Sequence, residues 1–228
     1  MGFYMKDGTV FEAAALPGLR AVIFDMDGVL VDSLDAMREA FSIAYREVVG
    51  AGEVPFAEYS KHLGRYFPDI MRIMGLPLAM QEPFVRESYR LAVQVPLFDG
   101  VRGLLVELRA AGLSLAVATG KSGPRARSLL AHLGVLEFFD HVVGSDEIAR
   151  AKPAPDIVLR AMDLLGVTPD EVVMIGDAVT DIEAARGASV IAIAATWGES
   201  DQAQLLTAEP DYVLRRPADL LRLLDAGR

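Results

Sequence analysis

The sequence contains no cysteine and only three histidines, His62, His132 and His141, among its 228 residues. Without cysteine, disulfide bonds, thiol nucleophiles, iron–sulfur clusters and cysteine-bound zinc are excluded. The histidines are too far apart in the sequence to form the closely spaced pair that is typical of a zinc site. A metal ion in this protein would therefore be held by oxygen ligands, which suit Mg²⁺ and other hard cations.

Basic residues and long apolar segments are also scarce. Lysine and arginine number 22 against 32 aspartates and glutamates, so the formal charge is −10. A protein that binds a nucleic-acid backbone needs a basic face, and a membrane-spanning helix needs about 18 consecutive apolar residues. We therefore expect no nucleic-acid partner and no membrane segment. The first residues show no signal-peptide pattern, so we expect a cytoplasmic protein. We also expect it to be a monomer or a homodimer.

Just over half of the residues (52%) are apolar, which is enough to form a sizeable core. From residue 97 onward, short apolar runs alternate with segments whose leucines recur at helical spacing and end at glycine. This alternation predicts an α/β fold with a Rossmann-like parallel sheet covered by helices on both faces. The expected strands are 21–24, 113–118, 141–144, 171–175, 190–195 and, at an edge, 212–214.

The block after the first strand interrupts this alternation, because about 60 residues are too many for a simple loop. Three apolar patterns at helical spacing lie within it, at 34–48, at 67–74, and at Phe84, Val85, Tyr89 and Ala92. We predict a helical domain inserted into the sheet domain, with a hinge at its two crossings. The expected division is a core of 19–33 and 97–228, a helical unit of 34–96, and an extension of unknown role at 1–18, with a turn at Asp7-Gly8.

Polar groups that could carry chemistry follow the predicted strands. In open parallel sheets, ligands bind beyond the carboxyl ends of the strands. Three carboxylates gathered there would repel one another unless a cation lay between them, and oxygen ligands suit Mg²⁺. A lysine and a hydroxyl beside them would complete a site for a phosphoryl group. The candidates are Asp25, Asp27, Thr119, Gly120, Lys152, Asp177 and Asp181.

The motif Asp25-Met26-Asp27-Gly28, followed in order by Thr119, Lys152 and Gly176-Asp177, resembles the four motifs of the haloacid dehalogenase-like hydrolase superfamily. The order and spacing match over roughly residues 19–197. The helical block resembles the cap of the phosphoglycolate phosphatase and β-phosphoglucomutase branch. More narrowly, 64–71 and 119–125 resemble a subgroup of phosphatase-like proteins associated with 3-amino-5-hydroxybenzoate synthesis.

This resemblance implies a catalytic role for each matching residue. Asp25 would be the nucleophile that forms an aspartyl phosphate, and Asp27 would be the general acid and base. Thr119 and the Gly120 amide would hold phosphoryl oxygens, and Lys152 would neutralise negative charge. A carboxylate at Asp27 favours phosphoryl transfer over attack on carbon.

The resemblance also implies a Mg²⁺ site. Asp25, the main-chain carbonyl of Asp27, and Asp177 would be ligands. Asp181 would orient metal-bound water or the Lys152 ammonium; alternatively, it is only a residue of the first helical turn.

The helical block is expected to select the substrate, because the core binds only the phosphate. Arg65, in a loop expected between the first two helices of the block, could pair with a substrate carboxylate or phosphate. His62 and Lys121 are further candidates for substrate binding. For Arg125 and Arg127 the favoured interpretation is a solvated helix face.

These observations together predict a Mg²⁺-dependent phosphatase that hydrolyses a small phosphomonoester, either a sugar phosphate or a compound like phosphoglycolate. The second motif, Thr119-Gly120-Lys121, is more like the phosphatases than the sugar phosphomutases. A β-phosphoglucomutase-like mutase is the alternative within enzymes. A phospho-acceptor signalling module is a remote alternative, because such domains lack a long helical insertion.

Overall fold

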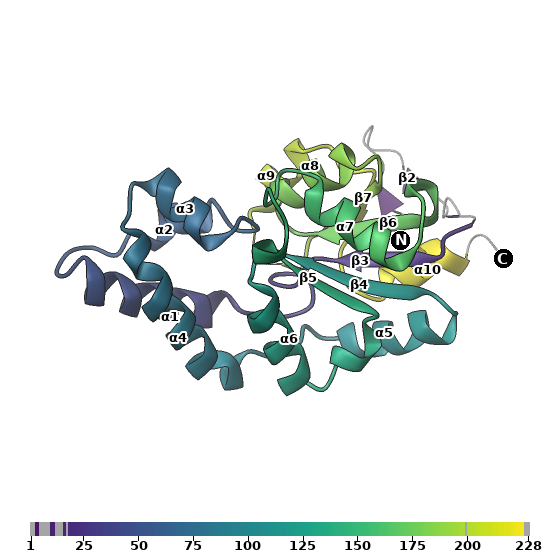
Figure 1. The fold of residues 1–228 in the computed structure, drawn as a ribbon. Coiled ribbons are helices and arrows are strands. Elements are labelled where there is room, and N and C mark those ends of the chain that lie inside the picture. The colour runs from purple at the N-terminus through teal and green to yellow at the C-terminus, as the bar shows by residue number, and fades with distance from the viewer. Residues whose placement is uncertain (1–2, 5–9, 12–15, 17, 199, 226–228) are drawn as a thin grey trace.

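The computed structural model describes residues 3–4, 10–11, 16, 18–198 and 200–225 (Figure 1). An α/β unit occupies one side of the molecule, and a group of helices from the first half of the chain projects from it. Within the described ranges, no helix has both the length and the apolar character needed to cross a membrane.

The sheet has the parallel core that the sequence predicts. Its parallel strands, in spatial order, are β8 (Tyr212–Leu214), β7 (Ile191–Ala195), β6 (Val172–Gly176), β3 (Ala21–Phe24), β4 (Ser114–Thr119) and β5 (His141–Gly144). Strand β3 is central and wholly buried, which explains its continuous apolar sequence. Two short antiparallel strands, β1 (Phe3–Tyr4) and β2 (Val10–Phe11), extend the β8 edge and were not predicted. The turn predicted at Asp7-Gly8 lies outside the described residues.

Helices cover both faces of the sheet, and each face has its own apolar cluster. Buried leucines of α5 (Val101–Ala110), α6 (Gly123–His132) and α10 (Asp219–Asp225) pack on one face. The other face is covered by α7 (Asp156–Leu165), α8 (Val179–Gly187) and α9 (Gln202–Thr207). Each fully buried leucine or isoleucine contributes about 1.5–3 kcal/mol, so the two clusters hold the strand ends in place. Short 3₁₀ turns η3 (Leu136–Phe138), η4 (Ser145–Glu147) and η5 (Pro169–Glu171) connect these elements.

The helical insert, residues 34–96, contains α1 (Leu34–Val48), α2 (Phe56–Ser60), α3 (Phe67–Met74) and α4 (Gln81–Leu91), with 3₁₀ turns η1 (Leu78–Met80) and η2 (Ala92–Gln94). It has its own apolar cluster, in which aromatic rings dominate. The Phe67 and Phe84 rings stack with centroids 4.1 Å apart, and the Phe41 and Tyr59 centroids are 4.4 Å apart. Helix α2 was not predicted, because its five residues are too short to show a helical period.

The predicted apolar face of α4 is partly wrong. Phe84 is buried as expected, but Tyr89 is 44% exposed. The buried face runs instead through Phe84, Glu87 and Leu91, which lie at helical spacing. The Glu87 carboxylate accepts hydrogen bonds from Arg86 and Arg90, and this pairing lets an acidic side chain lie where the sequence pattern favours an apolar one.

The insert is joined to the sheet through two segments that run side by side. Val31 and Leu97 form an antiparallel bridge. On either side of it, the Asp32 amide donates to Pro96 O at 3.0 Å and the Phe98 amide donates to Leu30 O at 3.1 Å. The two crossings therefore leave the core as a single paired stalk.

Candidate active site

Three adjacent strands bring the predicted catalytic residues to one edge of the sheet. Strand β3 lies between β4 and β6, and Phe24 is level with Val117 and Ile175. Asp25, which follows β3, is 2% exposed, and Thr119 at the end of β4 is fully buried. The Thr119 hydroxyl accepts a hydrogen bond of 3.1 Å from the Lys121 amide. The parallel register thus places side chains that are distant in sequence around one point.

Lys152 connects two of the carboxylates. Its ammonium nitrogen lies 2.8 Å from Asp25 Oδ1 and 2.6 Å from Asp181 Oδ1, and it donates a third hydrogen bond to Ala118 O at 3.2 Å. Burial alone would lower the pKa of Lys152, but the charges of Asp181 and Asp25 raise it above its ordinary value. The lysine is therefore held as a cation against the proposed nucleophile.

The carboxyl group of Asp25 experiences opposing influences. Burial raises the pKa of Asp25 well above its usual range, and Lys152 opposes this effect. The neighbouring charges of Asp181, Asp177 and Asp27 raise the pKa further. Negative charge at this point is thus only partly compensated by the protein, and an additional cation would stabilise it.

Asp27 has a different environment. Its Oδ1 accepts a hydrogen bond of 2.6 Å from the Ser33 hydroxyl and lies 3.1 Å from the Lys121 ammonium nitrogen. Burial raises the pKa of Asp27, but the Lys121 charge and the Ser33 hydrogen bond outweigh it, and the net direction is downward. The chain turns at Gly28, which has a φ of +79°. A Cβ at this glycine would overlap the Asp177 carboxylate, so the close approach of the turn after β3 to the residue after β6 requires glycine.

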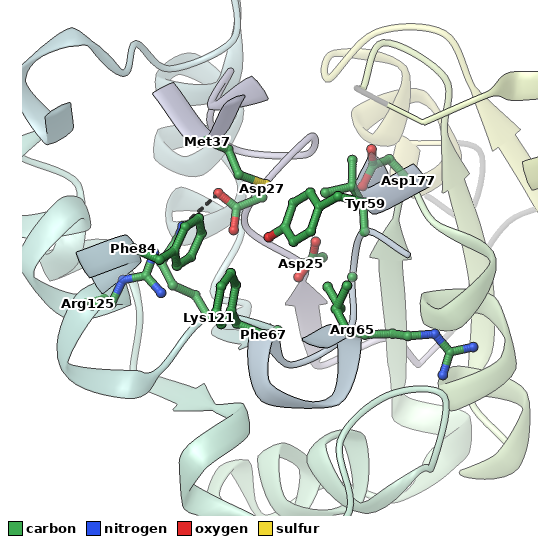
Figure 2. Close-up of a pocket in the computed structure, with 14 residues that line it drawn as sticks. Asp25, Asp27, Met37, Tyr59, Arg65, Phe67, Phe84, Lys121, Arg125 and Asp177 are labelled. Atoms are coloured by element: carbon green, nitrogen blue, oxygen red, sulfur yellow. Dashed lines mark ion pairs between the residues drawn. The ribbon is translucent and has the colours of Figure 1, made fainter. Parts of the chain in front are cut away.

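Three of the residues predicted at the metal site form a compact group of carboxylates. One oxygen from each of Asp25, Asp177 and Asp181 lies within 4.8 Å of the others, and all three residues are buried. Asp177 Oδ2 accepts hydrogen bonds of 3.2 Å from the amide and hydroxyl of Ser200. Both oxygens of Asp181 are engaged, one by Lys152 and the other by the Ala178 amide at 3.0 Å. Asp27, whose main-chain carbonyl is the predicted ligand, directs its side chain toward Lys121 (Figure 2).

A pocket opens from Asp25 and Asp27 toward the helical insert (Figure 2). Its walls are apolar on the side of the insert and charged on the side of the core. Tyr59, Phe67 and Phe84 stand over the carboxylates in this view. The lining residues from the insert are Met37, Tyr59, Leu63, Gly64, Arg65, Phe67, Ile70 and Phe84.

The loop between α2 and α3 closes on the core at this pocket. A Cβ on Gly120 would lie 2.6 Å from Gly64 O and 2.8 Å from Arg65 O, so the phosphate-binding candidate Gly120 packs directly against the loop backbone. The loop was expected between the first two helices of the insert, and it follows the unpredicted helix α2 instead.

The side chains predicted to bind substrate are placed differently from one another. Lys121 lines the pocket beside Asp27. Arg65 also lines it, but its guanidinium points away from Asp25 (Figure 2). The same side chain borders a second hollow between the insert and α8 and α9. His62 does not line the pocket, and its Nε2 lies 3.6 Å from Glu58 Oε1. A substrate role for Arg65 or His62 therefore stays a prediction.

Arg125 is a pocket residue that the sequence interpretation missed. It was expected on a solvated helix face, yet it is 8% exposed and lines the pocket with Asp27 and Lys121. Arg127 does lie at the surface side of the same helix, where it pairs with Glu147 at 2.8 Å. The spacing in the sequence could have indicated this buried position, because Arg125 precedes the buried Leu129 by four residues and therefore lies on the same face of the helix.

Comparisons with known proteins agree with this arrangement. A family model described as haloacid dehalogenase-like hydrolase matches residues 22–195. The tyrosine-protein kinase PtkA of Mycobacterium tuberculosis is 33% identical over 78% of this chain, but the match spans only 62% of that protein. A phosphoglycolate phosphatase of Synechococcus elongatus is 32% identical over 90% of this chain and 96% of its own. The solved structure of a hydrolase from Pseudomonas syringae has a TM-score of 0.79 and 25% identity, covering 90% of this chain and 98% of that one.

Proposed function

The chain belongs to the haloacid dehalogenase-like hydrolases, and we propose that it is a Mg²⁺-dependent phosphatase that hydrolyses a small phosphomonoester through an aspartyl phosphate on Asp25. The observation that carries this proposal is the position of Lys152, which holds the buried Asp25 carboxylate between the ends of three parallel strands. The similarity to phosphoglycolate phosphatases supports it further.

In the first step, an oxygen of Asp25 attacks phosphorus and the bond to the ester oxygen breaks. The leaving oxygen takes a proton from Asp27. In the second step, Asp27 removes a proton from water, which attacks the aspartyl phosphate, and phosphate and free Asp25 result. The Lys152 cation offsets charge on Asp25 in both steps, while Thr119 and the Gly120 amide would hold phosphoryl oxygens.

The acidic group fits a divalent cation. Asp25 and Asp177, with the Asp27 carbonyl, would hold Mg²⁺, and the Asp181 carboxylate would support the site through Lys152. When bound, the ion would neutralise charge between the carboxylates and the phosphoryl group. The raised pKa of Asp25 and the crowding of three buried carboxylates support a cation of this kind.

The helical insert, in this proposal, is a cap that shapes the pocket around the part of the substrate beyond the phosphate. Its aromatic side chains line the space above Asp25. Hydrolysis is favoured over a sugar phosphomutase, which would have to keep water from the aspartyl phosphate until a sugar hydroxyl attacks.

A phosphate-release screen over small phosphomonoesters, with Mg²⁺ and with EDTA, tests the proposal. We expect Mg²⁺-dependent release that the Asp25→Asn variant lacks. Release that EDTA does not reduce would contradict the metal requirement. Rapid conversion of β-glucose 1-phosphate to glucose 6-phosphate, with a trace of the 1,6-bisphosphate and little free phosphate, would instead establish the mutase.

A further inference from the structure

Arg125 lies at the opposite end of the pocket from Asp177, one of the candidate metal ligands. Figure 2 shows its guanidinium beside Phe84, with Asp25 between it and Asp177. The guanidinium carbon is 5.1 Å from the centroid of the Phe84 ring, within the range of a cation–π contact. Helix α6 of the core thus supplies a cation, and helix α4 of the insert supplies the aromatic ring that contacts it.

This guanidinium differs from the ammonium groups of Lys121 and Lys152 because no described carboxylate forms an ion pair with it. Arg65 also lines the pocket, but its guanidinium points away from Asp25. Lys152 is paired with Asp25 and Asp181, and Lys121 is paired with Asp27. Among the described residues, Arg125 forms no ion pair, and its guanidinium contacts the Phe84 ring instead. Arg127, two residues along the same helix, pairs with Glu147 and donates to Val142 O.

Burial removes much of the hydration of a charged side chain, and without an ion-pair partner that loss is not compensated. Burial accordingly lowers the pKa of Arg125, and only the more distant charge of Asp27 and nearby tyrosines oppose this. The contact with the Phe84 ring compensates only in part for the hydration that the guanidinium loses on burial. A ligand anion would replace the missing hydration, and the planar fork of arginine suits a carboxylate or phosphate.

We propose that Arg125 binds a second anionic group of the substrate, a carboxylate or a second phosphate carried on the leaving group, while the first phosphate lies at Asp25. This inference rests on the proposed phosphatase function and narrows it: the preferred substrates are phosphomonoesters with a further negative charge. Arg125 is then a specificity-determining residue of the core, and Phe84 holds its guanidinium in position.

Binding in an Asp25→Asn background with Mg²⁺ tests the proposal without turnover. The probes are matched pairs: 2-phosphoglycolate against 2-hydroxyethyl phosphate, 3-phosphoglycerate against glycerol 3-phosphate, and 1,3-propanediol bisphosphate against 3-hydroxypropyl phosphate. Adding Arg125→Met should lower the affinity for the member with the second anionic group, in at least one pair, by about tenfold or more, since hydrogen bonds to charged groups are the strong ones. The affinity for the other member of that pair should fall far less. Which pairs respond distinguishes carboxylate from phosphate.

Arg127→Met in the same background is the control and should leave every affinity unchanged. An equal loss for both members of all pairs, no loss at all, or no binding of any probe would overturn the proposal. Should Arg125→Met fail to fold by circular dichroism, Arg125→Lys keeps the charge without the fork, and the same discrimination should shrink.

Phosphate release by the wild-type protein separates this inference from the proposed function. If no probe is hydrolysed, the phosphatase proposal fails, whereas the binding series still decides the role of Arg125. If hydrolysis occurs and binding shows no charge discrimination, only the role of Arg125 fails.

Discussion

The ammonium nitrogen of Lys152 lies 2.8 Å from Asp25 Oδ1, although 127 residues separate the two in the chain. The lysine side chain is fully buried, and the carboxylate is 3% exposed. A buried pair of this kind is not a strong source of stability, but removing one partner leaves the other charge without compensation. The stability of the core and the chemistry of the site therefore depend on the same contact.

Replacing Lys152 should destabilise the folded protein as well as abolish its activity. We expect Lys152→Met to lower the free energy of unfolding by about 3–5 kcal/mol at pH 7, the usual effect of breaking a buried ion pair. Urea denaturation measures it. Lys61→Met is the control, because Lys61 pairs with Glu58 at the surface and should have almost no effect. Equal stability of the two variants would contradict a structural role for Lys152.

Removing the Asp25 charge should have opposite effects on activity and stability. We expect Asp25→Asn to abolish phosphate release, because an amide is a poor nucleophile. Lys152 keeps Asp181 as its partner in this variant, and the loss of a buried carboxylate crowded by other acids removes a destabilising charge. Its folded state should therefore be more stable than the wild type at pH 7 without Mg²⁺, by about 1–2 kcal/mol, the usual size of such gains at functional sites.

The sign of this stability effect follows from the raised pKa of Asp25. The folded state binds the proton more tightly than the unfolded state, so the contribution of Asp25 is fully favourable only below its unfolded pKa. That contribution is lost as pH rises through the folded pKa. The advantage of Asn over Asp should therefore shrink in acid. Thermal unfolding at several pH values checks this, and an advantage that grows in acid would contradict it.

The lowered pKa of Asp27 predicts a pH effect at Lys121. The Lys121 charge is the largest influence that lowers this pKa, so Lys121→Met should raise it. Asp27 would then keep the proton needed by the leaving group to higher pH. We expect the basic limb of the kcat/KM profile to move to higher pH while the maximum falls. An alkyl phosphate is the substrate to use, because its leaving group needs the proton; Lys121→Arg, which keeps the charge, should resemble the wild type.

A methyl group on the loop of the insert should disturb the pocket. Gly64 has a φ of +85°, and a Cβ there would overlap the buried Thr180 hydroxyl of the core. We expect Gly64→Ala to lower kcat/KM by about tenfold or more, since small displacements of positioning groups have effects of this size.

Gly75→Ala separates backbone strain from this contact. Gly75 has a φ of +65°, but no atom of the described residues, apart from its chain neighbours, lies within 4 Å of the position that a Cβ would take there. Both variants should lose about 1–2 kcal/mol of stability from the left-handed backbone, and only Gly64→Ala should lose activity. A similar loss of activity in both would show that the contact with Thr180 is unimportant.

Local sequence patterns predict much of the sheet. A buried parallel strand such as β3 must be apolar throughout, and polar residues at its carboxyl end then indicate the position of the site. The pairing of Lys152 with Asp181 could not be predicted in this way, because it depends on how α8 packs beside the loop that carries the lysine.

Arg125 is the charged residue that the sequence interpretation placed wrongly. It shares a helix face with apolar residues, and its charge alone suggested an exposed position. Glu87, for which no prediction was made from the sequence, also lies on the buried face of its helix. Which face of a helix is buried depends on tertiary packing. The direction of the Arg65 side chain likewise depends on how the loop turns at Gly64.

The paired crossing at Val31 and Leu97 has a consequence for how such proteins diversify. Because the two ends of the insert are hydrogen-bonded neighbours, the distance between its attachment points on the core is short and does not depend on the length of the insert. Lengthening a connection whose ends are fixed costs little entropy, about 0.6 kcal/mol for each doubling. The segment can be exchanged as a module, so recombination at this stalk could introduce a new substrate preference while the phosphoryl chemistry is inherited unchanged.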